Sequence, residues 1–369
     1  MTNPHLTHVR PPILEITPYQ PGKPIEAVAR ETGLADIIKL ASNESPLGPS
    51  PRALAAAQEA MLHIARYPEE YDLKAALAEF HSVDPQQITL GHGSSELFVH
   101  LATLLLGPQR NAVYSQYAFE IYPIVVKAAG ALGREVPALG PQARMPFGHD
   151  LAAMLAAVDR DTAMVFVTNP NNPTGTHLGY DELASFLERM PRHVMVVLDE
   201  AYVEYMGDRQ AKVGLHLLQH FPNVVLTRTF SKIHGLAGLR VGYAITSTAV
   251  ADLLNRVRLP FNVGRPSLAA AAASLQDTAH LERAFAINQE GRRFLVTALQ
   301  EMGLTVLPAA ANFVTVALPE AQAVYEALLA QGIIVRPLKS YGLPDYLRIT
   351  IGLPHENQRF VAALRRLLA

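Results

Sequence analysis

The 369-residue sequence contains no cysteine and no tryptophan. The absence of cysteine excludes disulfides, thiolate metal sites and a cysteine nucleophile. The net charge is only −2, so nothing indicates a surface for nucleic acid or for an anionic membrane. Apolar runs such as 194–198 are far too short to span a bilayer, and residues 1–10 are too polar for a secretory signal. We therefore expect a cytoplasmic protein that binds no nucleic acid, membrane or metal.

The middle of the chain alternates short, β-branched runs with longer segments of helical period. The runs are apolar on both faces, which is typical of parallel strands covered by helices on either side. Segments 151–158 and 180–190 are examples of the intervening helices. This pattern predicts an α/β fold with a mostly parallel central sheet, in which ligands lie beyond the carboxyl ends of the strands. The predicted strands are 111–114, 163–168, 194–198, 224–227 and 243–246.

The two ends of the chain differ from the middle. Residues 1–45 are rich in proline and predict an extended N-terminal arm that packs with a small domain. We expect a large domain over residues 46–265 and a smaller α+β domain over residues 266–369. Strands at 313–318, 332–336 and 346–351 and an amphipathic helix at 357–369 are predicted in the smaller domain.

The segment around Lys232 combines an amine with groups that bind phosphate. Thr229 and Ser231 precede the lysine, and Arg240 follows between two glycines. Lysine holds aldehydes as Schiff bases, whereas hydroxyls, a guanidinium and a glycine-rich loop suit a phosphate. An aldehyde held beside a phosphate indicates pyridoxal 5′-phosphate (PLP). The alternative is an ordinary exposed Ser-Lys pair, which is the commoner case.

A glycine-rich turn at residues 91–96 follows a short predicted strand, 88–90, and opens a helix. Such a turn presents free backbone N–H groups and the positive end of a helix dipole, which suit a phosphate. Ser94 and Ser95 lie at the helix start. The turn lacks the third glycine of a dinucleotide fingerprint. A strand-to-helix turn with a serine N-cap and no ligand is the alternative.

Two more polar turns follow predicted strands. Asp199 comes directly after the strand 194–198, and Asn172 lies in the turn after 163–168. A carboxylate at the end of a buried strand is costly unless it is paired, and a protonated pyridine nitrogen would be a suitable partner. Tyr202 could donate to the ring's phenolic oxygen. A helix N-cap or an internal salt bridge is the alternative for Asp199, and an ordinary turn for Asn172.

Taken together, these motifs resemble the fold-type I PLP-dependent aminotransferases, and in detail the histidinol-phosphate aminotransferases. The resemblance runs over nearly the whole chain and keeps its order. It is carried by PYQPGKP at 18–24, ASNE at 41–44, PLG at 46–48, RYP at 66–68, NNPTG at 171–175, DEAY at 199–202, residues 231–242 and LRIT at 347–350.

The resemblance implies a role for each matching residue. Lys232 would hold PLP and shuttle a proton, and it would form the catalytic group with Asp199 and Tyr202. Phe119 would stack on the cofactor ring, with Tyr117 and Tyr122 as open alternatives. Tyr67 would reach the cofactor phosphate of a neighbouring subunit, which implies a homodimer. The implied cofactor-binding residues are Ser94, Ser95, Phe119, Asn172, Asp199, Tyr202, Thr229, Ser231, Lys232, Arg240 and Tyr67.

The resemblance also implies substrates. Arg348 would bind the carboxylate of glutamate and Arg336 a substrate phosphate, while Tyr19 and Asn43 would cover the site from the arm. The implied reaction is transamination between L-histidinol phosphate and 2-oxoglutarate, giving imidazole-acetol phosphate and L-glutamate. An aromatic amino-acid aminotransferase and a phosphothreonine-type decarboxylase are alternatives on the same scaffold. A PLP-binding regulator without catalysis and a nicotinamide-dependent dehydrogenase are alternatives from other classes.

Overall fold

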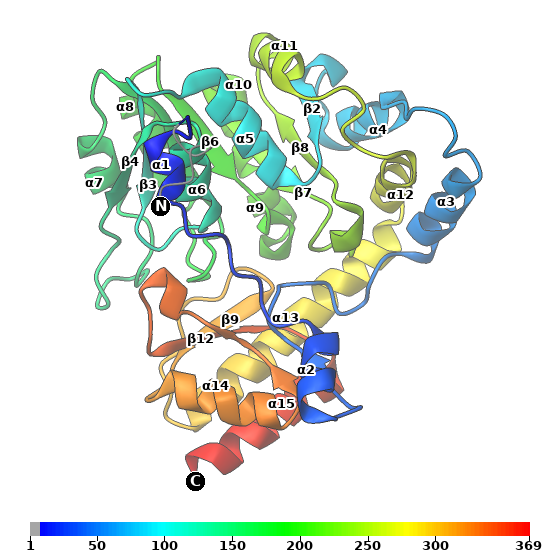
Figure 1. Cartoon of the computed structure of the whole chain (residues 1–369), viewed down its shortest axis with the longest axis vertical. Coiled ribbons are helices and arrows are strands. Elements are labelled where there is room, and N and C mark those ends of the chain that lie inside the picture. Colours follow the sequence, from blue (N-terminus) through cyan, green and yellow to red (C-terminus); the bar gives the residue numbers. More distant parts are fainter. Residues whose placement is uncertain (1–7) are drawn as a thin grey trace.

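The computed structural model describes residues 8–369. Residues 1–7, which belong to the expected arm and to the polar stretch 1–10, lie outside it. The chain forms a large α/β part, built on a seven-stranded sheet, and a small part, built on a three-stranded sheet (Figure 1). The long helix α13 (Thr278–Glu301) leads from the first to the second. No helix within residues 8–369 is both long enough and apolar enough to cross a membrane.

The large sheet has the strand order β2-β8-β7-β6-β5-β3-β4, and the predicted α/β fold is confirmed. Neighbouring strands run parallel from β7 to β4, whereas β8 is antiparallel to both β7 and β2. The strands are β2 (Ile88–Gly91), β3 (Asn111–Ser115), β4 (Leu132–Val136), β5 (Thr162–Thr168), β6 (Met195–Asp199), β7 (Val224–Thr229) and β8 (Gly242–Ile245).

The direction of β8 corrects the prediction that residues 243–246 form a parallel strand. A parallel neighbour needs a crossover long enough to return to the starting edge, usually a helix. Only residues 230–241 separate β7 from β8, and their one regular element is a single 3-10 turn, Ala237–Leu239. The chain therefore reverses at the carboxyl edge of β7. As a result Lys232 and Arg240, which lie in this connection, stay at the same edge of the sheet.

Alternate residues of each strand enter two different cores, which explains why the strands are apolar on both faces. In β5, Val165 and Val167 pack in a core that includes residues of α8 and α10. Met164 and Phe166 pack in another, with residues of α5, α6 and α11. These helices are α5 (Ser94–Leu105), α6 (Ile121–Ala128), α8 (Tyr180–Arg189), α10 (Val213–His220) and α11 (Thr248–Val257), and α7 (Leu151–Ala156) and the short α9 (Asp208–Ala211) complete the layers.

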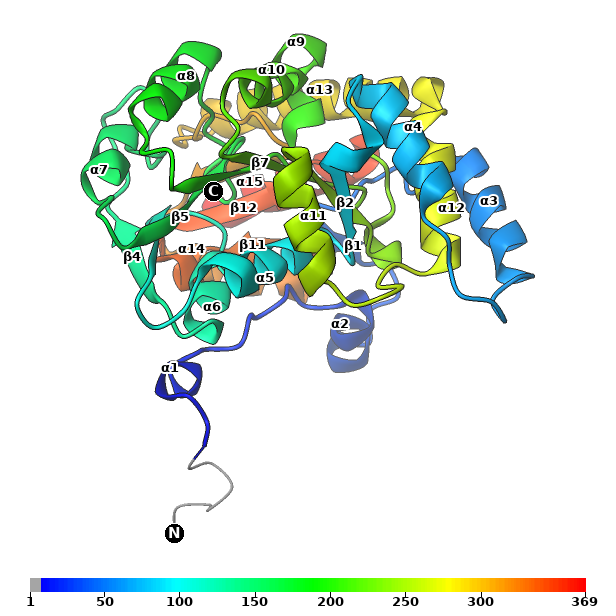
Figure 2. The same cartoon turned by 90° about the horizontal axis from the view of Figure 1, so that it is seen from above.

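Three further helices lie together at the β2 end of the sheet (Figure 2): α3 (Pro51–Met61), α4 (Tyr71–His81) and α12 (Arg265–Leu275). Leu268 and Leu275 of α12 share the core of the large part with Leu73 and Leu77 of α4. Any division of the chain at residue 265 would separate α12 from this core. These contacts favour a boundary near residue 276 for the proposed two-domain organisation.

The small part packs α13, α14 (Ala321–Ala330) and α15 (Pro354–Leu368) against an antiparallel sheet of order β11-β12-β9. The sheet strands are β9 (Phe313–Ala317), β11 (Arg336–Pro337) and β12 (Tyr346–Thr350). The segment predicted as one strand at 332–336 is divided. Its first half, β10 (Ile333–Ile334), pairs with β1 (Ile38–Lys39) of the arm, and only β11 joins the sheet. The arm also contains α1 (Pro11–Leu14) and α2 (Ile25–Thr32).

A buried ion pair ties the end of β6 to β7. Arg228 Nε donates to Glu200 Oε2 over 2.8 Å, and both side chains are at most 3% exposed. Arg228 Nη2 also donates to the carbonyl of Ala211 over 2.5 Å. Burial alone lowers the pKa of Arg228, but Glu200 and neighbouring acidic groups outweigh this effect, so its pKa lies above the ordinary value. The guanidinium therefore stays charged.

We expect Arg228→Met to destabilise the protein by about 3–5 kcal/mol, because it leaves the Glu200 carboxylate buried without its partner. Urea denaturation of wild type and variant measures this loss. The double variant Glu200→Met with Arg228→Met removes both charges, and we expect it to recover most of the loss. A double variant as unstable as the single one would contradict this explanation.

Candidate active site

A cavity of about 250 Å³ lies at the carboxyl edge of the large sheet, between the large part, the small part and the arm. Residues from both ends of the chain meet in its walls. Of the residues predicted from the sequence, all but Tyr67 line it: Tyr19, Asn43, Ser94, Ser95, Phe119, Asn172, Asp199, Tyr202, Thr229, Ser231, Lys232, Arg240, Arg336 and Arg348.

Lys232 lies three residues beyond the end of β7, in the connection to β8. Its Nζ donates to the carbonyl of Ser42 over 3.3 Å and lies 5.4 Å from the centre of the Tyr202 ring. Within residues 8–369 it makes no salt bridge. Burial, followed by the positive charge of Arg348, lowers the pKa of Lys232 to about 8. An amine with this pKa is partly unprotonated near neutral pH, as a nucleophile must be.

Groups that bind phosphate lie together in the wall of the cavity. Helix α5 begins at Ser94, and its N-cap, Gly93, has no side chain to occupy the free N–H groups. The Thr229 hydroxyl donates to Ser231 Oγ over 3.0 Å, and Arg240 Nη1 donates to the same oxygen over 3.3 Å. A helix N-terminus, two hydroxyls and a guanidinium therefore converge.

A glycine makes this convergence possible. A Cβ on Gly242, the first residue of β8, would lie 2.3 Å from the backbone nitrogen of Ser94. Only glycine lets the start of β8 approach the turn before α5 so closely. This contact places the end of the β7–β8 connection, which carries Arg240, beside the N-terminus of α5.

The wall of the cavity also holds a carboxylate without a cationic partner among residues 8–369. Asp199 is 3% exposed. It accepts hydrogen bonds from the Tyr122 hydroxyl (2.6 Å), the Ala201 N–H (3.3 Å) and the Thr227 hydroxyl (3.4 Å). Burial raises the pKa of Asp199 to about 6, although these hydrogen bonds act in the other direction. A protonated ring nitrogen would satisfy this carboxylate.

The contact between Tyr122 and Asp199 was not predicted. From the sequence, Tyr122 is only an alternative to Phe119 for stacking on a cofactor ring. Phe119 lines the cavity, whereas Tyr122 is fully buried. Tyr117 packs edge-on against Phe147, at 5.4 Å between ring centres. No sequence signal could have placed Tyr122 beside Asp199, because the contact joins α6 to β6 across the sheet.

Two arginines from the small part complete the wall. Arg336 of β11 and Arg348 of β12 stand directly opposite each other in the antiparallel ladder. Arg348 donates to Asn172 Oδ1 and, over 2.7 Å, to the carbonyl of Ala41. Arg336 lies 3.5 Å from Glu120 and under the ring of Tyr19. Both guanidinium groups are more than nine-tenths buried.

The arm supplies two of the predicted residues. Asn43 is buried, and its Nδ2 donates to the Tyr202 hydroxyl over 3.0 Å. Its own backbone N–H donates to Thr350 Oγ1 of β12, so the arm is tied to both parts at this point. Tyr19 remains 44% exposed at the mouth of the cavity, with its ring edge toward Phe119 at 6.3 Å.

Tyr67 lies away from the cavity of its own chain. Its side chain is 76% exposed and stacks on Phe261, with 4.4 Å between the ring centres. It lines a separate hollow formed by residues 64–68 and 264–266. The structure therefore does not bring Tyr67 together with the other predicted site residues.

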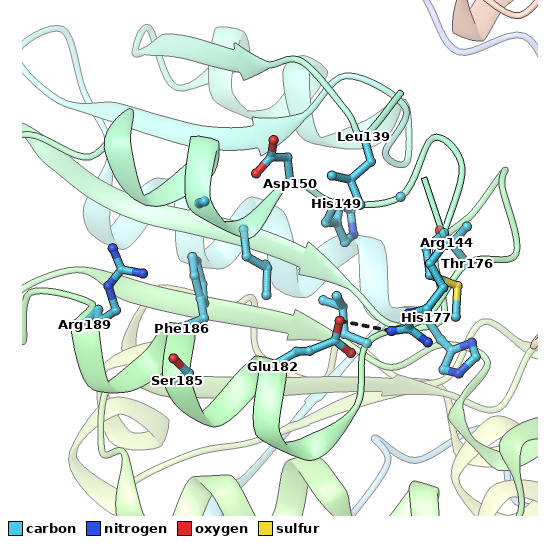
Figure 3. Close-up of a pocket in the computed structure, with 15 residues that line it drawn as sticks. Leu139, Arg144, His149, Asp150, Thr176, His177, Glu182, Ser185, Phe186 and Arg189 are labelled. Atoms are coloured by element: carbon cyan, nitrogen blue, oxygen red, sulfur yellow. Dashed lines mark hydrogen bonds and ion pairs between the residues drawn. The ribbon is translucent and has the colours of Figure 1, made fainter. Parts of the chain in front are cut away.

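A larger cavity, of about 360 Å³, lies between residues 139–152 and α8 (Figure 3). Its rim carries the ion pair of Arg144 and Glu182, at 3.3 Å, and its wall includes His149, whose Nε2 lies 2.9 Å from the carbonyl oxygen of Thr168. None of the predicted site residues lines it. It offers no lysine, so the smaller cavity is the candidate active site.

The residues of the smaller cavity fit PLP. The cavity brings together a carboxylate that lacks a cationic partner among residues 8–369, a phosphate-binding group and an amine with a lowered pKa. The fold is that of a fold-type I PLP-dependent transferase.

Comparison with known proteins identifies the family. The model of the family described as aminotransferase class I and II matches residues 35–364. A histidinol-phosphate aminotransferase of Pseudomonas aeruginosa is 49% identical over 99% of this chain and 98% of its own length. One of Methylococcus capsulatus is 50% identical over 97% of each chain. The chain therefore belongs to the class I and II aminotransferases and, within them, to the histidinol-phosphate aminotransferase family, as the resemblance in its motifs predicted.

A solved structure supports the same assignment. The crystal structure of histidinol-phosphate aminotransferase from Sinorhizobium meliloti, in complex with pyridoxal 5′-phosphate, matches with a TM-score of 0.87. It is 30% identical and covers 98% of each chain.

We expect the rate of covalent attachment of PLP to the cofactor-free enzyme to rise with pH, with a midpoint of about 8. The lowered pKa of Lys232 means that its reactive, unprotonated form predominates above this pH. Trapping with borohydride at timed intervals, followed by mass analysis of the modified peptide, measures the rate. Lys232→Ala is the control and should trap no PLP at this position. A midpoint near 10.5, the ordinary value for lysine, would contradict the proposed effect of burial.

Proposed function

We propose that this protein transfers an amino group between L-histidinol phosphate and 2-oxoglutarate, giving imidazole-acetol phosphate and L-glutamate, with PLP as cofactor. The observation that carries the proposal is the pair of buried guanidinium groups, Arg336 and Arg348, in the same cavity as Lys232. Family membership supports it, because the relatives compared above are histidinol-phosphate aminotransferases.

The two arginines suit substrates that share an anionic end. A guanidinium binds carboxylate and phosphate alike through paired, charge-assisted hydrogen bonds. Buried Arg348 Nε has no hydrogen-bond partner within residues 8–369, so it retains a donor for such a group. Arg336 is held by Glu120 at 3.5 Å, a contact that an incoming anion could replace. One site can therefore accept a dicarboxylate and a phosphorylated amine in turn.

The chain's own residues position the cofactor and move protons. PLP, when bound, withdraws the electron pair left at the substrate's α-carbon into its ring. Asp199 would face the ring nitrogen, Asn172 and Tyr202 the ring's phenolic oxygen, and Phe119 one face of the ring. Lys232 Nζ would remove the proton from the substrate's α-carbon and deliver it to the neighbouring carbon of the cofactor. A group with a pKa of about 8 suits both steps.

A comparison of substrates tests this function. With 2-oxoglutarate as acceptor, we expect kcat/KM for L-histidinol phosphate to exceed that for L-histidinol or L-phenylalanine by about 10- to 100-fold or more. The reason is that each charge-assisted hydrogen bond to the phosphate contributes about 1.5–3 kcal/mol. The measurement is steady-state turnover of the purified, PLP-loaded protein.

Other outcomes of the same panel point to other activities. Faster turnover of phenylalanine would indicate an aromatic amino-acid aminotransferase. Release of carbon dioxide from phosphothreonine without any keto acid would indicate a decarboxylase. Equal rates for histidinol phosphate and histidinol would contradict the proposed role of the arginines.

We also propose that the protein is a homodimer and that Tyr67 acts in the partner's site. Several large apolar side chains are exposed around the end of α3, the start of α4 and the chain before α12: Leu62 (75%), Tyr71 (70%), Leu259 (70%) and Phe261 (56%). An exposed apolar cluster of this kind marks an interaction surface. A second copy is the favoured occupant, because the resemblance implies that Tyr67 binds a neighbouring cofactor.

We expect the double variant Leu259→Asp with Phe261→Asp to be monomeric, because two charges would be buried in the interface. Light scattering coupled to gel filtration measures the mass, and dialysis measures the PLP retained. Leu132→Asp is the matched control: Leu132 is 61% exposed on β4, at the opposite edge of the sheet, and the variant should remain dimeric. A wild-type monomer at micromolar concentration would contradict the proposal.

A further inference from the structure

Tyr122 approaches Asp199 from the side of the protein core. Its hydroxyl donates to Asp199 Oδ2 over 2.6 Å, the shortest of the three hydrogen bonds that this carboxylate accepts. Asp199 and Thr168 line the candidate active site, whereas Tyr122 is fully buried behind them. The phenol therefore contacts the carboxylate without occupying space in the cavity.

The position of the phenol is fixed by its surroundings. The Tyr122 ring stacks on Phe166 of β5, at 4.3 Å and 13° between planes, and meets the edge of Phe98 of α5 at 5.3 Å. Its hydroxyl also shares a hydrogen bond with Thr168 Oγ1 over 2.7 Å. Because close packing restricts the ring to this orientation, its hydroxyl is held against the carboxylate.

Few other charges face Asp199. Burial raises the pKa of Tyr122 well above its ordinary value, so the phenol keeps its proton and acts as a donor. The other titratable groups that face Asp199 are Glu200 and Tyr202, which follow it in the chain, and Lys232 beyond β7. Glu200 and burial favour the protonated acid, so the short bond from Tyr122 is the main local contact that favours the carboxylate.

We propose that Tyr122 is a positioning residue that keeps Asp199 ionised and correctly oriented for the ring nitrogen of the cofactor. This inference rests on the proposed binding of PLP, though not on the identity of the substrate. Without the phenol, a proton shared between the carboxylate and the ring nitrogen would move toward the carboxylate. The ring nitrogen would then lose the positive charge that makes the cofactor an electron sink.

The test is Tyr122→Phe, which removes only the hydroxyl. The readout is the nitrogen-15 NMR signal of bound, ring-labelled PLP as a function of pH. A hydrogen bond to a charged group contributes about 1.5–3 kcal/mol, so we expect the ring nitrogen to lose its proton about one to two pH units lower than in wild type. Phe98→Leu, which alters the packing around the ring but keeps the hydroxyl, is the matched control and should titrate like wild type.

Identical titrations of wild type and Tyr122→Phe would overturn the proposal. If Tyr122→Phe does not fold, Thr168→Val gives a second test, because it removes the hydroxyl that shares the phenol's hydrogen bond. It should shift the midpoint in the same direction, and an unchanged midpoint would also overturn the proposal. Failure of the wild type to bind labelled PLP would instead refute the proposed function, so the two failures are distinguishable.

Discussion

The buried ion pair between Glu200 and Arg228 fixes the edge of the sheet on which the site is built. Asp199 immediately precedes Glu200, and Thr229 immediately follows Arg228. Neighbouring residues of a strand point to opposite sides. Glu200 and Arg228 pair on the side of the sheet that faces away from the cavity. Asp199 and Thr229 therefore point toward the cavity. Both residues line the cavity, so the ion pair behind them holds the carboxylate and the phosphate-binding group in a fixed relation.

Burial acts on Lys232 and Asp199 in opposite directions. It lowers the pKa of the amine to about 8 and raises that of the carboxyl to about 6, since in both cases it disfavours the charged form. Two groups that would otherwise titrate far from neutrality are thereby brought close to it. Hydrogen bonds from the residues behind the cavity oppose the effect of burial on Asp199, while within residues 8–369 the carbonyl of Ser42 is the only hydrogen-bond partner of the Lys232 amine.

The sequence predicted those features that depend on local composition. Apolar runs located the parallel strands β3, β5, β6 and β7, but not the edge strand β4, which is mostly exposed or half-buried. The polar turns after the predicted strands contained several of the residues that line the cavity. Contacts between distant segments were not predictable. The reversal of β8, the division of residues 332–336 into two strands and the contact of Tyr122 with Asp199 all depend on which segments meet after folding. A pattern of burial along one segment carries no information on its partner, and Tyr122 reads simply as a core aromatic.

The ladder that joins Arg336 to Arg348 has a consequence for the choice of substrate. Residues directly opposite in an antiparallel pair are about 4.5–5.5 Å apart at their α-carbons, and this spacing is set by the backbone. The backbones that carry Arg336 and Arg348 are therefore held together within the small part, while Lys232 belongs to the large part. The distance from the amine to the two arginines therefore depends on how the small part is placed against the large part, where Arg348 bonds to Asn172 and Arg336 lies beside Glu120. The placement of the two parts would thus set how far a substrate's anionic end must lie from its amino group for the substrate to contact both the arginines and Lys232.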